Sequence, residues 1–387
     1  LDRYDLEAGI AGFEPLHQVV ALRTSVPEEL ALVLRVAAQT EVVRVTPAPQ
    51  LVDATITGTR TQVSFVGIEQ LPAPVGSRGV ESVLVTLPGF AQNANGAIHP
   101  RGAHNQMTFV VDGLPISDQL TGAFANALDA GLVQSAELWT GNIPAEFGAK
   151  VSGVVVITSR SGLGASRPLT GDATLAAAGF GTWHASAQGG GERGRFGYYA
   201  SATTMRTDRF LDQVSLDNLH NSGTFGRGFG RVDLRLSDTQ TVRAHVMGGR
   251  SQFELANLRS QQQNGQDQQQ RLSDGAIWGA YTVTMGHAST LEIVAGRRGT
   301  RAALDPSAGD VPVTARQDRA MATTTATARL TRLLGTHSLR AGLDVQRVDV
   351  RESFTMGLTS ADFNAPGSDG YNAALALARQ GNMAVVP

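Results

Sequence analysis

The chain has 387 residues, of which 42% are hydrophobic and 17% charged, and its formal net charge is −2. This near-neutral balance argues against the basic face of a nucleic-acid-binding protein, so no nucleic-acid partner is expected. The absence of cysteine excludes a disulfide framework and a thiolate metal site. No stretch reaches the roughly 18 consecutive apolar residues that a transmembrane helix requires.

Short β-strands within residues 1–50 are the first predicted elements. Apolar and acidic residues alternate from Tyr4 to Ala8, and β-like runs follow at 19–22 and 30–36. This spacing is typical of a small antiparallel sandwich, but so short a region cannot bury a good core alone. We therefore expect the C-terminal part of a β-sandwich domain. Because the sequence begins without Met or a signal peptide, we expect a piece of a longer protein.

Residues 55–162 mix helix and strand signals. Apolar residues recur at helical spacing from Val80 to Leu87, which predicts an amphipathic helix, and Pro88-Gly89 ends it. The other predicted elements are a strand at 107–111, a short helix within 123–132 and a strand at 154–158. This pattern indicates an α+β globule.

From residue 168 to the end, apolar and polar residues alternate. For example, Val232 and Leu234 alternate with Arg231 and Asp233, so each predicted strand has one apolar and one polar face. The strands run to about 10–15 residues, which is longer than usual in soluble proteins. We expect nine or ten of them.

The connections between these strands alternate in length. Short turns are predicted near 237–240, 286–288 and 334–336, and long polar loops near 208–226, 251–272 and 300–318. All long loops then lie at one end, as in an outer-membrane β-barrel. A soluble β-sandwich or solenoid, whose strands also alternate, is the alternative.

Several motifs in residues 55–162 occur in a fixed order. They are 80–90 (VESVLVTLPGF), 101–102 (RG), 109–115 (FVVDGLP), 137–141 (ELWTG), 147–148 (FG) and 153–159 (GVVVITS). Together they resemble the plug domain of TonB-dependent outer-membrane receptors, although Phe147-Gly148 stands where the family usually has Tyr-Gly. Residues 1–50 resemble the end of a carboxypeptidase-regulatory-like, transthyretin-type domain.

The resemblance implies three domains and a set of plug residues. The fold would be a short β-sandwich remnant (1–50), an α+β plug (55–162) and the N-terminal part of an antiparallel transmembrane β-barrel (168–387), which is incomplete. The residues of the plug's structural motifs would be Arg101, Gly102, Asp112, Gly113, Pro115, Gly141, Phe147, Gly148 and Gly153. We expect Asp112-Gly113 to form a tight turn, and Arg101 to pair with a carboxylate.

Two further groups of residues follow from the resemblance. Ligand-binding residues at the plug apex would be Gln92, Asn93, Asn95, His104, Asn105, Asp118 and Gln119, although ordinary polar loop composition explains them too. The segment 41–47 (EVVRVTP) resembles a Ton box, with Val42, Val43, Val45 and Thr46 as its extended residues, or else is the last strand of the first domain. His99, His104 and Asp118 fit no metal-ligand spacing, so no metal site is predicted.

The function implied is that of a receptor in the outer membrane. It would bind a small ligand such as a glycan or siderophore outside the cell and import it when a TonB-type energy-transducing protein rearranges the plug. Outer-membrane lipid would be a further partner, and no cofactor is expected. No nucleophile elbow, P-loop or zinc-protease motif suggests an enzyme. A surface receptor or adhesin without import and a soluble carbohydrate-binding β-protein remain alternatives.

Overall fold

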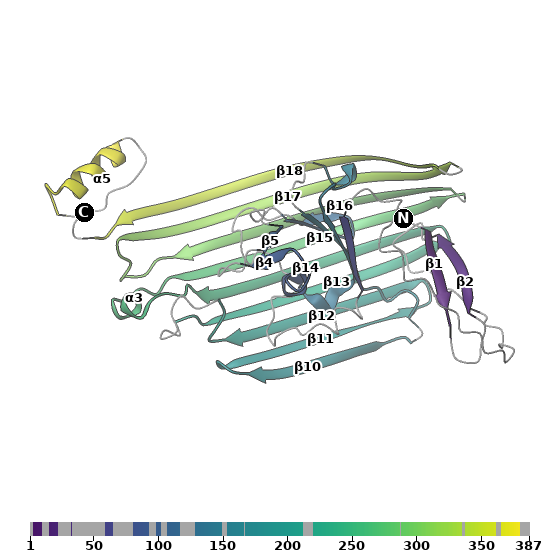
Figure 1. Cartoon of the computed structure of the whole chain (residues 1–387), viewed down its shortest axis with the longest axis horizontal. Coiled ribbons are helices and arrows are strands. Elements are labelled where there is room, and N and C mark those ends of the chain that lie inside the picture. Colours follow the sequence, from purple (N-terminus) through teal and green to yellow (C-terminus); the bar gives the residue numbers. More distant parts are fainter. Residues whose placement is uncertain are drawn as a thin grey trace.

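The structure is a computed structural model with two main parts, a small mixed sheet and a large curved sheet (Figure 1). It describes residues 3–9, 15–21, 32, 59–64, 80–92, 98–101, 107–116, 128–148, 153–165, 167–211, 220–286, 288–334, 337–360 and 365–379. All structural statements below refer to these residues. Among them, no helix is long and apolar enough to cross a membrane.

The large sheet, called the wall below, has nine antiparallel strands in chain order. The strands are β10 (Thr170–Ala178), β11 (Thr182–Arg193), β12 (Phe196–Thr207), β13 (Gly223–Ser237), β14 (Gln240–Glu254), β15 (Gln269–Met285), β16 (Ser289–Asp305), β17 (Val313–Leu334) and β18 (His337–Leu358). Each strand pairs with the next, as the predicted alternation of strands and turns requires. The strands lengthen from 9 residues in β10 to 22 in β17 and β18, so the later ones exceed the expected length.

In the middle strands of the wall, the outer face exposes apolar residues, whereas the inner face buries charged residues beside apolar ones. Val232 and Val246 are 47% and 55% exposed, whereas their neighbours Arg231 and His245 are each 2% exposed. A soluble protein buries apolar side chains and exposes charged ones. An apolar surrounding such as lipid would favour the exposed apolar face, and the plug covers the charged one.

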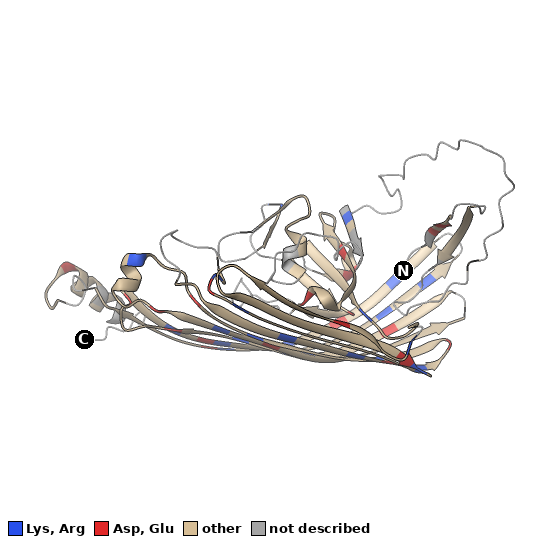
Figure 2. Cartoon of the chain, turned by 90° about the horizontal axis from the view of Figure 1, so that it is seen from below, with Lys and Arg blue, Asp and Glu red and all other residues tan. Residues whose placement is uncertain are grey.

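A five-stranded mixed sheet, called the plug below, lies on the concave side of the wall (Figure 2). Its strand order is β3 (Thr59–Ser64), β8 (Val133–Thr140), β9 (Gly153–Ser159), β6 (Met107–Val111) and β7 (Leu114–Ile116). Only β6 and β9 run parallel. The remaining elements are helix α2 (Val80–Leu84), the small pair β4 (Phe90–Gln92) and β5 (Ile98–Pro100), and the 3-10 turns η1 (Ala130–Leu132) and η2 (Ala145–Phe147).

One apolar core joins the plug to the wall. Val111, Leu132 and Val155 of the plug belong to the same buried cluster as Phe229 and Trp278 of the wall. Because neither sheet encloses this core alone, the wall's inner face completes the plug. This is the α+β unit followed by an antiparallel meander that the sequence predicts.

Some predicted element bounds differ from the structure. Helix α2 ends at Leu84 rather than Leu87, because residues 85–89 form turns in which the hydroxyl of Thr86 donates to the Val83 carbonyl. Of the helix expected within 123–132, the described part is the short turn η1, which Asp129 caps through the backbone N–H of Gly131. The long loops span 208–222, 255–268 and 306–312, so each is shorter than expected.

At the N-terminus, β1 (Arg3–Ala8) and β2 (Leu16–Ala21) form an antiparallel pair. The predicted run at 30–36 lies outside the described residues except for Leu32. The three domain boundaries stay predictions. Beyond the wall, α3 (Arg259–Gln263) lies in the glutamine-rich loop and α5 (Asp369–Arg379) follows β18.

Candidate functional site at the plug and wall interface

The centre of the interface is a tight turn of the plug. Asp112 and Gly113 connect β6 to β7 with positive φ angles of 44° and 86°, the combination that a two-residue hairpin turn of this hand requires. A Cβ atom on Gly113 would lie 2.8 Å from a methyl group of Val294 on β16. Glycine is thus needed twice, for its φ angle and for its close approach to the wall.

The Asp112 side chain is fully buried against the wall. Its Oδ1 accepts a hydrogen bond from the backbone N–H of Ser159 at 3.2 Å and lies 3.5 Å from Nη1 of Arg231. Its Oδ2 lies 3.4 Å from Nε2 of His245. A plug carboxylate is therefore enclosed by polar groups from β9 and from two wall strands, β13 and β14.

Arg231 joins the two parts through its guanidinium fork. On the wall side, its Nη2 donates to Asp233 at 2.7 Å and its Nε donates at 2.9 Å. On the plug side, its Nη1 donates to the carbonyl and the hydroxyl of Ser159 at 2.8 and 3.0 Å. Asp233 also accepts from the hydroxyl of Ser161 at 2.7 Å. Such paired, charge-assisted bonds are the stronger kind in a dry interior.

His245 and Arg243 extend this polar group along β14. The His245 ring stacks on Trp278 with centroids 4.6 Å apart and planes 9° from parallel. Arg243 donates to the Thr282 hydroxyl at 2.9 Å and forms an ion pair with Glu292. These groups support the ring and the charges around Asp112 from the wall side. We call Asp112, Ser159, Arg231, Asp233 and His245 the plug-to-wall contact.

Electrostatics keep the Asp112 carboxyl ionised. Burial alone would raise its pKa, but the charges of Arg231, His245 and Arg243, with the hydrogen bond to Ser159, hold the pKa below the ordinary value. A buried carboxylate without such partners would take up a proton instead. The buried carboxylate therefore stays charged because the wall and Ser159 supply its partners.

Polar contacts at the edges of the plug accompany this centre. The Tyr199 hydroxyl lies 2.6 Å from the Gly131 carbonyl, and Arg227 donates to the Leu128 carbonyl at 3.5 Å. Arg340 of β18 forms an ion pair with Glu146 of the plug at 2.9 Å. The plug is thus attached to several strands of the wall by polar groups, in addition to the shared apolar core.

The predicted structural motifs of the plug lie at turns and strand ends. Gly141 follows β8 with φ 75°, and Gly148 follows η2, which ends at Phe147, with φ 61°. Pro115 stands in β7 opposite Val110. Gly153 begins β9 opposite Met107.

Arg101 follows β5 with φ 47°, and its backbone N–H donates to the Gly89 carbonyl at 2.7 Å. Its guanidinium lies beside Gly141. Within the described part of the chain, the carboxylate partner expected for Arg101 is not seen.

The predicted ligand and energy-coupling residues fall largely outside the described residues. Of the plug-apex set, only Gln92 is described, as the last residue of β4. The residues that lie outside are Gly102, Asn93, Asn95, His104, Asn105, Asp118, Gln119, Val42, Val43, Val45 and Thr46. Their roles stay predictions.

Sequence reasoning missed the wall's half of the contact. Alternation places Arg231 and Asp233 only on a polar strand face, and the same spacing of opposite charges occurs in the exposed pair Arg347 and Asp349. It also missed a group of three residues that could hold a metal ion. In this group, the ring nitrogens of His220 lie 3.6 Å from Glu254 and 3.4 Å from Asp267. These three residues come from separate loops and strand ends, so no sequence spacing connects them.

Comparison with known proteins supports the fold. No family model matches the sequence, and no curated protein matches it. Solved structures of plugged receptors do match. One is the ferripyoverdine receptor of the outer membrane of Pseudomonas aeruginosa bound to ferripyoverdine, with a TM-score of 0.62 and 12% identity. The match covers 77% of this chain and 43% of that chain.

Two other solved receptors match comparably. The siderophore receptor PiuA from Acinetobacter baumannii has a TM-score of 0.56 at 13% identity, over 76% of this chain and 46% of its own. The alcaligin outer-membrane receptor FauA from Bordetella pertussis has a TM-score of 0.54 at 12% identity, over 79% and 49%. The chain spans less than half the length of each. It has the fold of TonB-dependent siderophore receptors, with a plug and part of the wall.

Proposed function

We propose that the protein is an outer-membrane receptor that binds a small ligand outside the cell and imports it when the plug is rearranged. The observation that carries this proposal is the wall's inverted polarity, with an apolar face outward and charged groups inward against the plug. Lipid explains the outer face. A plug that contacts the wall through buried polar groups as well as through an apolar core explains the inner one, because the polar groups can be wetted when the plug is rearranged.

The ligand class proposed is a metal-chelating siderophore or a glycan. Two of the solved receptors with this fold are receptors for ferripyoverdine and alcaligin, and the predicted apex residues are mostly amides and other polar groups. The partner proposed for import is a TonB-type protein that pairs with the extended segment 41–47 by strand addition.

The test is to link the plug to the wall with a disulfide bond. Gly113→Cys with Val294→Cys places two Cβ atoms about 3.6 Å apart, within the range that a disulfide requires. The chain has no cysteine of its own, so no other bridge can form. Cells producing the oxidised double variant should bind labelled ferripyoverdine, ferric alcaligin or a glycan from a panel but should not import it, and reduction should restore uptake.

A matched control uses the same wall position. Ala280→Cys with Val294→Cys joins two strands of the wall, where these residues are direct partners, and leaves the plug free. It should import normally. Binding without import in the unmodified protein, or uptake that a protonophore does not abolish, would favour a surface receptor without import. Import by the oxidised plug-to-wall variant would contradict the proposal.

A further inference from the structure

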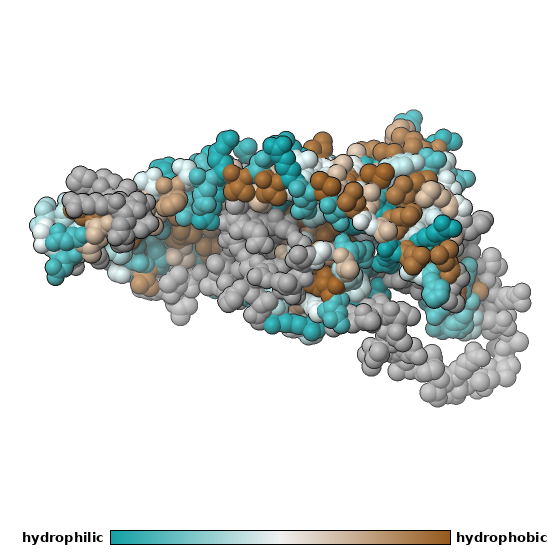
Figure 3. Space-filling view, turned by 90° about the horizontal axis from the view of Figure 1, so that it is seen from above, coloured by the Kyte–Doolittle hydropathy of each residue, from teal (hydrophilic) through white to brown (hydrophobic). Residues whose placement is uncertain are grey.

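The outer face of the wall changes from apolar to polar toward the long-loop ends of the strands. Val246 of β14 pairs with Ile277 of β15, and both side chains face away from the plug. They are 55% and 66% exposed. Nearer the long-loop ends of the same strands, this outer face carries Arg250, which pairs with Ser273, and Arg271, which pairs with Gln252. Figure 3 shows hydrophobic residues gathered mainly on the half of the wall away from α5.

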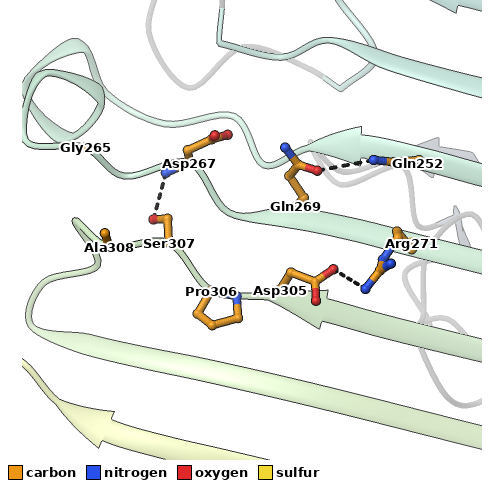
Figure 4. A pocket seen from close by; sticks show the side chains of 9 residues that line it. All are labelled: Gln252, Gly265, Asp267, Gln269, Arg271, Asp305, Pro306, Ser307 and Ala308. Carbon is orange, nitrogen blue, oxygen red and sulfur yellow. Dashed lines mark hydrogen bonds and ion pairs between the residues drawn. The ribbon is translucent and has the colours of Figure 1, made fainter.

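Four arginines from four neighbouring strands line one hollow on this outer face. They are Arg250 of β14, Arg271 of β15, Arg301 of β16 and Arg316 of β17, and the hollow has a volume of about 620 Å³. A smaller hollow of about 510 Å³ adjoins it at the loop ends (Figure 4). The two share Gln252, Arg271 and Asp305. We call the larger one the arginine hollow.

The arginine hollow has more positive than negative charge. Asp305 accepts from Arg271 at 2.6 Å and lies 3.3 Å from Arg316, and Asp318 accepts from Nε of Arg301 at 2.8 Å. These two aspartates neutralise half of the charge of the four arginines. Arg250 has no ion-pair partner among the described residues. The remaining positive charge faces outward, where the plug and any imported ligand do not reach.

The distance between the arginine hollow and the apolar part of the wall fits the position of lipid headgroups in a bilayer. Arg271 lies six residues from Ile277 along β15, and Arg250 lies four residues from Val246 along β14. At ~3.3 Å per residue, these separations are about 13–20 Å along tilted strands. Arginine is disfavoured in the hydrocarbon layer but binds phosphate through its paired donors at the layer's edge. Thr204, Thr224 and Ser273 add hydroxyl groups to the lining.

We propose that the arginine hollow binds the phosphate groups of an anionic lipid of the outer leaflet, and this rests on the proposed location in the outer membrane. The arginines supply paired donors to phosphate oxygens, and the hydroxyl groups contact the rest of the headgroup. The bound lipid would lie beside the wall, with its chains along the apolar band and its phosphates in the hollow. This site is separate from any ligand site above the plug.

The test measures lipid binding by the purified full chain in neutral detergent micelles. The probes are a bisphosphorylated lipid A, the same glycolipid without phosphates, and inorganic phosphate. Arg250→Gln with Arg316→Gln removes two donors and leaves the Arg301–Asp318 pair and the bond from Arg271 to Asp305 in place. We expect this variant to bind the phosphorylated lipid at least about tenfold more weakly, with an unchanged melting temperature.

Arg332→Gln is the matched control. Arg332 is exposed on the outer face of β17, near the short-turn end. It should bind the lipid as the unmodified protein does. Equal binding of the phosphate-free glycolipid, unchanged binding in the double variant, or full competition by millimolar inorganic phosphate would overturn the proposal. Membrane insertion is measured separately, so loss of insertion with lipid binding retained would count against the proposed function alone.

Discussion

Oδ2 of Asp112 in the plug lies 3.4 Å from Nε2 of His245 in the wall, and both side chains are fully buried. These two groups belong to sheets that share no hydrogen-bonded strand pair. The plug is therefore held by side-chain contacts rather than by continuation of the wall, and a pull on the plug has to separate the Asp112 carboxylate from the Arg231 guanidinium. This geometry leads to measurable consequences.

Removing the Asp112 charge should weaken the interface strongly. Asp112→Ala leaves Arg231 with one carboxylate and leaves Ser159 without its acceptor. Loss of one partner from a buried ionic group typically costs about 3–5 kcal/mol. Urea unfolding followed by tryptophan fluorescence should show such a loss. The control Asp349→Ala removes an exposed carboxylate paired with Arg347 and should cost less than about 1 kcal/mol. Equal effects would disprove a special role of Asp112.

Acid should weaken the contact only at low pH. Because the folded-state pKa of Asp112 is lowered, its contribution is complete above the ordinary pKa of the carboxyl and is lost as pH falls through the lowered value. The stability difference between the unmodified protein and Asp112→Asn should stay constant from pH 8 to about 5. It should shrink only in stronger acid. A difference that already declines near pH 6 would show that another group controls the contact.

A methyl group at Gly113 should force the plug away from the wall. Gly113→Ala introduces both an unfavourable positive φ and a contact of 2.8 Å with Val294, and together these should cost about 2–4 kcal/mol. Gly148→Ala is the matched control, because Gly148 also has a positive φ but its added Cβ meets nothing within 4 Å. It should cost about 1–3 kcal/mol, because the φ of 61° and ψ of −155° at Gly148 suit glycine alone. Limited proteolysis of the plug should distinguish the two, and identical cleavage rates would argue against the close approach.

The sequence predicts the strands of the wall but not how the wall meets the plug. Alternation shows two faces on β13, yet it does not say that Arg231 faces inward, because a soluble sheet with the same pattern would face its polar side to water. The predicted loops are too long because the ends of the strands, beyond the apolar band, carry polar residues on the outer face. The sequence of such a strand end resembles that of a polar loop. Arg271 is one example, and it belongs to β15 rather than to a loop. The ion pair across 119 residues between Asp112 and Arg231 needs the assembled fold.

Deleting Val42–Thr46 should abolish import and leave ligand binding intact if this segment is the one pulled by a TonB-type protein. Strand addition gives most of its affinity through backbone bonds, so replacing the segment with another extended β-branched sequence should retain partial uptake. A glycine-serine replacement should not. Uptake assays in cells and ligand-binding assays on the same strains make the comparison. Normal uptake after the deletion would assign 41–47 to the first domain instead.

A charge on the apolar face of the wall tests the membrane location directly. Val246 and Leu258 are both exposed apolar residues, 55% and 43% respectively. Val246 lies on the outer face of β14, whereas Leu258 lies in the loop 255–268. In a bilayer, Val246→Arg should cost about 2–4 kcal/mol near the midplane and should reduce the amount of protein inserted, as measured by outer-membrane fractionation and urea unfolding in lipid. Leu258→Arg should have little effect, because its side chain stays in water. In a soluble β-protein both positions face water, and the two substitutions would be tolerated equally.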